Sequence, residues 1–260
     1  MTYFDLMGKL GMEFLHPGGK ASTEMLIKEL EPGMTKKILE IGCGTGATAV
    51  SISKRFKPYM VAVDASESML RAAKQRAFIS FGLGKIDFVK VDRTGKLPFS
   101  DASFDAVYSE SVIGVSGESC IPVLMSEISR VLKPGGRLVC NDAIWNQHAN
   151  REEIEYLTNL GLRDFGFSVC SSKPAYLNEW IDAYKAAGLS SVKVYPIDTI
   201  TPADNYAKRS LYTYYRKFMS RISPSVRKQK KVFDQWENKH HRTDVSMLDG
   251  FMFVLEKKAH

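Results

Sequence analysis

Short apolar runs alternate with longer stretches of helical periodicity between residues 36 and 196. This alternation is typical of a parallel α/β sheet, in which helices connect successive strands. The apolar runs predict strands over residues 37–41, 59–63, 86–91, 104–109, 137–141, 191–195 and 250–256. Between the runs, the periodicity predicts helices near residues 46–56, 66–80, 119–132 and 176–187.

Two segments lie outside this alternation. The first holds the turn sequence His16-Pro17-Gly18-Gly19 and a helical run over residues 22–30. The second separates the last two strands by far more than the roughly two to six residues usual for a loop, and its apolar residues recur at helical spacing. We therefore expect an N-terminal cap segment (1–35), an α/β domain (36–197 and 246–260) and a helical insertion (198–245) that forms a lid with the cap.

The composition is that of an ordinary soluble globular protein, with 44% hydrophobic and 25% charged residues in a chain of 260. No apolar run approaches the ~20 residues of a membrane-spanning helix, and Asp5 and Glu13 interrupt any basic-then-apolar signal pattern. The four cysteines are widely spaced without a CxxC pair, which argues against a zinc module or a disulfide framework. We expect a cytoplasmic protein without a bound metal.

The net charge of +7 is concentrated in the last quarter of the chain. Residues 197–260 hold 13 Lys and Arg against 7 Asp and Glu, whereas the first 196 residues hold 23 against 22. This nearly neutral body disfavours a nucleic-acid partner. The run 205–231 has nine cations, four tyrosines and no acid. It is either a solvated helix face or a surface for an acidic substrate, an anionic membrane or RNA.

A glycine-rich loop follows the first predicted strand, in the sequence Glu40-Ile41-Gly42-Cys43-Gly44-Thr45-Gly46. Glycines at this position allow a tight turn and let a ligand approach the backbone. The spacing is G-x-G-x-G and not the dinucleotide fingerprint G-x-G-x-x-G. An acidic residue beside the loop suits a cationic amino-acid ligand better than a diphosphate.

Four further motifs follow the loop in order. Asp64 ends the second predicted strand, and Asp92 follows the third. A Leu-Pro-Phe segment with Ser-Phe-Asp lies over residues 97–107, and a Leu-Lys-Pro-Gly-Gly segment lies over residues 127–138. With the glycine loop, this series over residues 36–142 resembles class I S-adenosylmethionine (SAM)-dependent methyltransferases. The last two segments are most similar to the ubiquinone/menaquinone and sterol-type branch of that family.

The resemblance implies a Rossmann-like class I methyltransferase fold: a seven-stranded mixed sheet, of order 3-2-1-4-5-7-6, with helices on both faces. Its last strand is antiparallel and follows the helical insertion. The resemblance also implies SAM as cofactor and S-adenosylhomocysteine as product. The residues expected to bind the cofactor are Glu40, Gly42, Cys43, Gly44, Gly46, Asp64, Ala65, Met69, Asp92, Arg93 and Ser109.

Several of these residues have an alternative structural interpretation. The resemblance implies that Glu40 contacts the amino group of SAM, that Asp64 contacts its ribose and that Asp92 contacts its adenine. However, Asp64 also suits a helix N-cap, and an Asp before a loop is common. Met69 suits a core position, and Cys43 is interpreted as a small loop residue and not a nucleophile.

The catalytic candidates follow the predicted strand ends, where open α/β sheets bind ligands. Methyl transfer is an in-line displacement, so positioning supplies most of the acceleration and a base is needed only if the acceptor loses a proton. Glu110 and His148 are the candidate bases, and His16 joins them if the N-terminal segment folds over the pocket. A structural role is the alternative for each. Core packing is favoured over a thiol site for Cys120, Cys140 and Cys170.

The expected function is methylation of a small molecule, with lipid-like and acidic acceptors both considered. One alternative is an RNA or protein methyltransferase that docks through the basic insertion. Another is a non-enzymatic SAM-binding protein. The sequence determines neither the methylated atom nor the oligomeric state.

Overall fold

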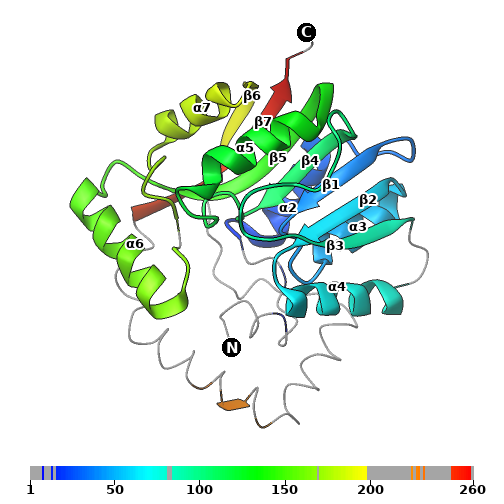
Figure 1. Cartoon of the computed structure of the whole chain (residues 1–260), viewed down its shortest axis with the longest axis horizontal. Coiled ribbons are helices and arrows are strands. Elements are labelled where there is room, and N and C mark those ends of the chain that lie inside the picture. The colour runs from blue at the N-terminus through cyan, green and yellow to red at the C-terminus, as the bar shows by residue number, and fades with distance from the viewer. Residues whose placement is uncertain are drawn as a thin grey trace.

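A single twisted sheet forms the centre of the molecule (Figure 1). The computed structural model describes residues 16–80, 84–168, 170–197 and 247–258, together with Gly8, Glu13, Pro224, Arg227, Lys228 and Lys231. The described strands are β1 (Lys37–Ile41), β2 (Tyr59–Asp64), β3 (Ile86–Lys90), β4 (Phe104–Glu110), β5 (Leu132–Trp145), β6 (Leu189–Ile197) and β7 (Leu248–Lys257). Each overlaps a run predicted from the sequence, although β5 begins five residues before its predicted start at residue 137.

The strand order is β3-β2-β1-β4-β5-β7-β6, which confirms the order implied by the family resemblance. Strands β1 to β5 pair in parallel, and β7 pairs antiparallel with both β5 and β6. The carboxyl ends of β1, β2 and β4 therefore lie at one edge of the sheet, where ligands bind in open α/β folds.

Helices cover both faces of the sheet (Figure 1). Helices α2 (Gly19–Leu30), α3 (Ala47–Phe56) and α4 (Glu67–Ile79) share one apolar cluster, to which they contribute Leu26, Ile52 and Leu70. Helices α5 (Cys120–Val131) and α7 (Leu177–Ala186) share the opposite cluster through residues such as Ile128 and Trp180. Residues 19–30 of the predicted cap segment therefore pack against the sheet through α2.

Helix α6 (Arg151–Phe165) has no counterpart among the predicted elements. Its first turn has a capping box: the Asn150 side chain accepts from the Glu153 backbone N–H, and the Glu153 side chain accepts from the Asn150 N–H. Ile154 and Leu157 anchor the helix in a third cluster with Trp145. The helix thus stands beyond the end of β5.

Strand β5 runs four residues past its predicted end at Asn141. Its pairing with β7 continues to Trp145, opposite Leu248, and this ladder extends the strand. Cys140 and Cys170 are buried, as expected for core residues. The structure contains no helix long and apolar enough to cross a membrane among the residues it describes.

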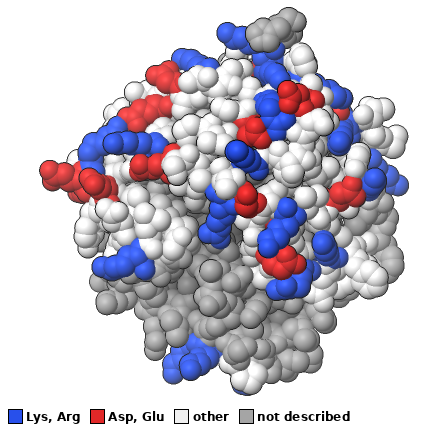
Figure 2. Space-filling view, viewed as in Figure 1, with Lys and Arg blue, Asp and Glu red and all other residues white. Residues whose placement is uncertain are grey.

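Lys and Arg are interspersed with Asp and Glu on the described surface shown in Figure 2. This mixture agrees with the near balance of charges counted over the first 196 residues. The predicted insertion and nearly all of its basic run lie outside the described residues. Their role as a lid or docking surface therefore stays a prediction.

Candidate functional site

A cavity of about 1000 Å³ opens at the carboxyl edge of the sheet. Ile41 of β1, Asp64 of β2 and Glu110 of β4 lie on its wall. A second cavity of about 90 Å³ adjoins it and shares Gly42, Gly44, Met69 and Glu110 with the larger one. The glycine loop therefore separates a large compartment from a small one.

The three glycines of the loop have different tasks, although each has a positive φ (Gly42 69°, Gly44 52°, Gly46 73°). A Cβ on Gly42 would lie 2.3 Å from a methyl carbon of Val112, and one on Gly46 would lie 2.9 Å from Cβ of Ala73. A Cβ on Gly44 would meet nothing within 4 Å. Gly44 thus faces open space in the cavity, whereas Gly46 lines neither cavity and lets α3 approach α4.

Asp64 is fixed at the end of β2 by two backbone donors. Its carboxylate accepts from the Gly44 N–H at 2.8 Å and from the Ser66 N–H at 2.7 Å. Burial raises the pKa of Asp64, and these two hydrogen bonds oppose the increase. The N-cap of α4 is Ser66, whose hydroxyl accepts from the Met69 N–H. Asp64 therefore does not cap α4, which was the alternative interpretation of this residue.

Two carboxylates, Glu40 and Glu110, face the small cavity. Glu40 is buried, and its Oε2 atom has no hydrogen-bond partner among the described residues. Burial first, and then the neighbouring Glu110, raises the pKa of Glu40 well above its usual range. A cation in the cavity would stabilise the ionised form of Glu40.

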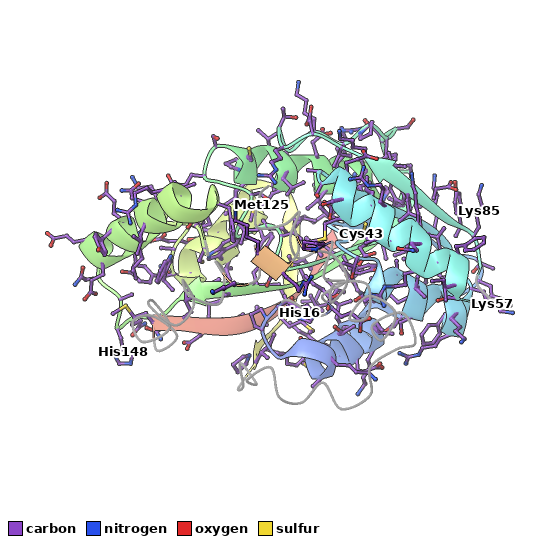
Figure 3. All side chains as sticks on the ribbon, turned by 90° about the horizontal axis from the view of Figure 1, so that it is seen from below. His16, Cys43, Lys57, Lys85, Met125 and His148 are labelled. Carbon is purple, nitrogen blue, oxygen red and sulfur yellow. The ribbon has the colours of Figure 1, made fainter. Side chains whose placement is uncertain are left out.

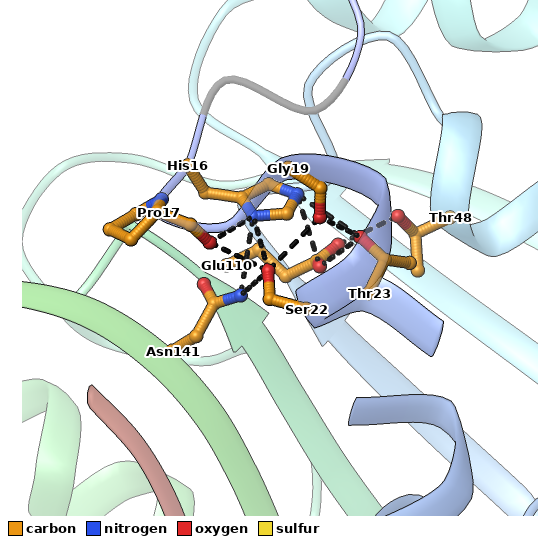
Figure 4. A network of polar contacts seen from close by, with 8 residues as sticks. All are labelled: His16, Pro17, Gly19, Ser22, Thr23, Thr48, Glu110 and Asn141. Carbon is orange, nitrogen blue, oxygen red and sulfur yellow. Dashed lines mark hydrogen bonds and ion pairs between the residues drawn. The ribbon is translucent and has the colours of Figure 1, made fainter. Parts of the chain in front are cut away.

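Glu110 is held in a network that joins the N-terminal segment to the sheet (Figure 4). Its oxygens accept from the Thr23 hydroxyl and from the Thr48 hydroxyl, both at 2.7 Å. The His16 Nε2 atom lies 3.2 Å from Glu110 Oε1. Asn141 donates to the Ser22 hydroxyl at 3.1 Å in the same network. The structure therefore brings together two of the three predicted catalytic residues, His16 and Glu110.

His148 does not join them. It is exposed, lines neither cavity and lies far from His16 and Cys43 in Figure 3. His148 follows strand β5, as predicted, but β5 extends to Trp145 and the structure does not bring His148 into the candidate site.

The other predicted cofactor residues divide into three groups. Ala65, Met69, Asp92 and Arg93 line the large cavity, Cys43 lines the small one, and Met69 lines both. Asp92 is exposed at the rim, where hydrogen bonds from Thr94 lower its pKa. Ser109 lines neither cavity and is fully buried within β4. The expected cofactor contact of Ser109 is corrected, since the next residues, Glu110 and Ser111, line the large cavity instead.

The far wall of the large cavity contains no residue that was predicted from the sequence to belong to the site. This wall contains one face of α6 and the segment after it, and its residues are Arg151, Ile154, Glu155, Thr158, Asn159, Leu162, Gly166, Phe167, Ser168, Ser171, Ser172 and Lys173. The sequence Asn150-x-x-Glu153 was the available signal, because it is typical of a capped helix start.

Residues 38–136 match a family model described as a methyltransferase domain. The match spans the glycine loop, Asp64, Asp92 and Glu110, and the strand order is the one that the family resemblance implies. Residues 38–136 are therefore similar to a methyltransferase domain. The match agrees with the resemblance drawn from the motifs, and the strand order confirms the expected Rossmann-like fold.

The curated relatives named here align with about half of this chain or less. The uncharacterized methyltransferase YodH of Bacillus subtilis is 38% identical over 137 residues, which are 53% of this chain and 56% of YodH. The ubiquinone/menaquinone biosynthesis C-methyltransferase UbiE of Bartonella bacilliformis is 40% identical over 106 residues, 40% of each chain. The chain thus spans little more than half the length of the curated relatives it matches.

Among solved structures, phosphoethanolamine N-methyltransferase 2 of Haemonchus contortus in complex with SAM aligns with a TM-score of 0.67. The alignment covers 98% of this chain and 56% of that protein at 20% sequence identity. At that identity the likeness shows a shared fold and does not identify an acceptor.

Proposed function

We propose that the protein transfers the methyl group of SAM to a small-molecule acceptor bound in the large cavity. One observation carries the proposal: two carboxylates, Glu40 and Glu110, face a compartment beside Gly44, where the loop backbone has no side chain between it and the cavity. The unpartnered Oε2 of buried Glu40 fits the ammonium group of a methionine moiety. The residues present therefore fit SAM.

Different residues of the two cavities suit the different chemical groups of SAM. Glu40 and Glu110 would receive the ammonium group, and Asp64 would accept hydrogen bonds from the ribose hydroxyls. Met69, Val91 and Leu97 line the large cavity and would offer apolar contacts to the adenine. Asp92 at the rim is the acceptor available to the adenine amino group.

When bound, SAM supplies a sulfonium-linked methyl group, which passes to the acceptor as the S–C bond breaks and S-adenosylhomocysteine forms. The protein's contribution is to hold the acceptor in line and to exclude water. Glu110 accepts hydrogen bonds from two hydroxyls, as described above, so it suits a fixed anionic binding group better than a mobile base. His16 acts through Glu110, which it contacts directly.

The acceptor half of the cavity lies between the loop after β4 and helix α6. Val112, Val115, Ile154, Leu162 and Phe167 line this half, so an acceptor with a substantial apolar part fits it. An additional contact between the basic run and an anionic molecule or membrane surface belongs to the same proposal.

Calorimetry tests the cofactor assignment. Wild-type protein is expected to bind SAM and S-adenosylhomocysteine, and Asp64→Ala should weaken SAM binding by about 1–3 kcal/mol because buried polar groups lose their partners. The exposed carboxylate Asp182 on α7 provides a control, and Asp182→Ala should bind like wild type. Tight NAD binding without SAM binding would contradict the proposal.

A further inference from the structure

Three described residues of the N-terminal segment, Gly8, Glu13 and His16, contact α4 or β4 near the two cavities. A Cβ on Gly8 would lie 3.2 Å from the carbonyl carbon of Ser68 and 3.3 Å from the Met69 nitrogen, so the backbone at Gly8 lies directly against the start of α4. His16 contacts Glu110 at the tip of β4. Between them along the chain, Glu13 contacts Arg76 of α4.

Arg76 connects this segment to the glycine loop. The arginine is only 4% exposed, although it lies on a helix that otherwise faces solvent with its charged residues. Its Nε donates to the Thr45 carbonyl at 2.8 Å, and its Nη2 donates to the Thr45 hydroxyl at 3.3 Å. Its Nη1 forms an ion pair with Glu13, whose side chain is also largely buried.

Thr45 lies between Gly44 and Gly46, so the guanidinium holds the middle of a loop that glycine makes easy to deform. The Gly44 N–H in turn donates to the Asp64 carboxylate. A continuous series of contacts therefore runs from Glu13 through Arg76 and the glycine loop to the carboxylate assigned to the ribose.

Burial makes this series sensitive to the loss of one charge. A buried ion pair that loses one partner leaves an uncompensated charge away from water, which is strongly unfavourable. The Arg55–Glu24 pair also joins the region before β1 to the helix after the glycine loop, but its side chains are 41% and 45% exposed. The Arg55–Glu24 pair therefore serves as a control: it is an ion pair in the same region, but it is exposed to solvent.

We propose that Arg76 is a positioning residue for the cofactor: paired with Glu13, it fixes the glycine loop beside the cofactor half of the cavity. The identity of the ligand rests on the proposed function. The role of Arg76 in ordering the loop does not.

Two variants and one control test this role. Glu13→Gln removes the charge opposite Arg76, and Arg76→Lys retains the charge but replaces the planar donor set that binds Thr45. We expect each to weaken S-adenosylhomocysteine binding at least tenfold, mainly through faster dissociation in stopped-flow measurements. Hydrogen exchange of the amides in residues 42–46 should accelerate in the absence of any ligand. Glu24→Gln should leave all three measurements unchanged.

The outcomes separate the two proposals. If wild-type protein binds no SAM while loop exchange accelerates in the variants, the proposed function fails and the positioning role stands. If folded Glu13→Gln and Arg76→Lys both match wild type in ligand dissociation and loop exchange, the positioning role is wrong. Should Glu13→Gln fail to fold, the same comparison is made with Arg76→Lys, which keeps the positive charge opposite Glu13.

Discussion

Asp142 is a buried carboxylate just behind the wall of the large cavity. Its Oδ1 accepts from the backbone N–H of Gly114, which lines the cavity, at 3.1 Å. Its Oδ2 has no hydrogen-bond partner among the described residues. Burial raises the pKa of Asp142 to about 7, and the hydrogen bond from Gly114 only partly offsets this effect.

The raised pKa predicts a stability that falls with pH. Between pH 4 and pH 7 the native state keeps a proton on Asp142 that the unfolded state releases, so the free energy of unfolding decreases by up to about 4 kcal/mol over this window. Asp142→Asn still accepts from Gly114 but cannot ionise. The difference in melting temperature, variant minus wild type, should therefore be larger at pH 8 than at pH 5. An equal difference at both pH values would contradict the assignment.

The glycine loop predicts a separation of stability from binding. Gly46→Ala combines a positive φ with a clash against Ala73, and we expect it to destabilise the fold by about 2–4 kcal/mol. Gly44→Ala carries only the cost of its φ, about 1–2 kcal/mol, but it places a methyl group in the cavity. Denaturant unfolding should rank Gly46→Ala as less stable, and calorimetry should show the weaker SAM binding in those Gly44→Ala molecules that remain folded.

Residue roles that follow from strand ends were predictable, and those that depend on long-range packing were not. Asp64 and Glu110 end buried strands, so the apolar pattern alone places them at one edge of the sheet. The Thr23–Glu110 hydrogen bond joins residues 87 apart, and the Arg76–Glu13 pair joins residues 63 apart. Local spacing contains no information on either contact, and an arginine in an amphipathic helix is ordinarily interpreted as exposed.

At the scale of elements, α6 predicts an acceptor-specific effect. Its capping box supplies hydrogen bonds at the end of the helix that carries Arg151 and Ile154 into the cavity wall. Asn150→Ala should cost about 1 kcal/mol of local stability. We expect the Michaelis constant for the acceptor to rise while SAM affinity is unchanged, as measured by a coupled assay and calorimetry. Asn178→Ala, at an exposed position of α7, serves as the control. A matching loss of SAM affinity in Asn150→Ala would show that α6 is not confined to the acceptor side.

The burial pattern of each element explains whether it could be predicted from the sequence. Buried parallel strands such as β1 and β2 appear as continuous apolar runs, which is why they were located from the sequence. The extension of β5 was missed because Asn141 and Asp142 interrupt its apolar run, although both are buried. Helix α6 was missed because it begins with charged residues and anchors only a small cluster through Ile154 and Leu157. In both cases tertiary contacts outweigh the local pattern.

For the whole molecule, the position of β7 governs the order in which the sheet can be completed. Strand β7 lies between β5 and β6, and its own residues come last among the strands. While the ribosome synthesises residues 198–247, β5 has an unpaired edge and β6 has no neighbour in the sheet. Unpaired edges of this kind promote association with other chains. A nascent chain stalled before residue 248 is therefore expected to bind chaperones, and release of the last strand lets β7 form two antiparallel ladders, one with β5 and one with β6.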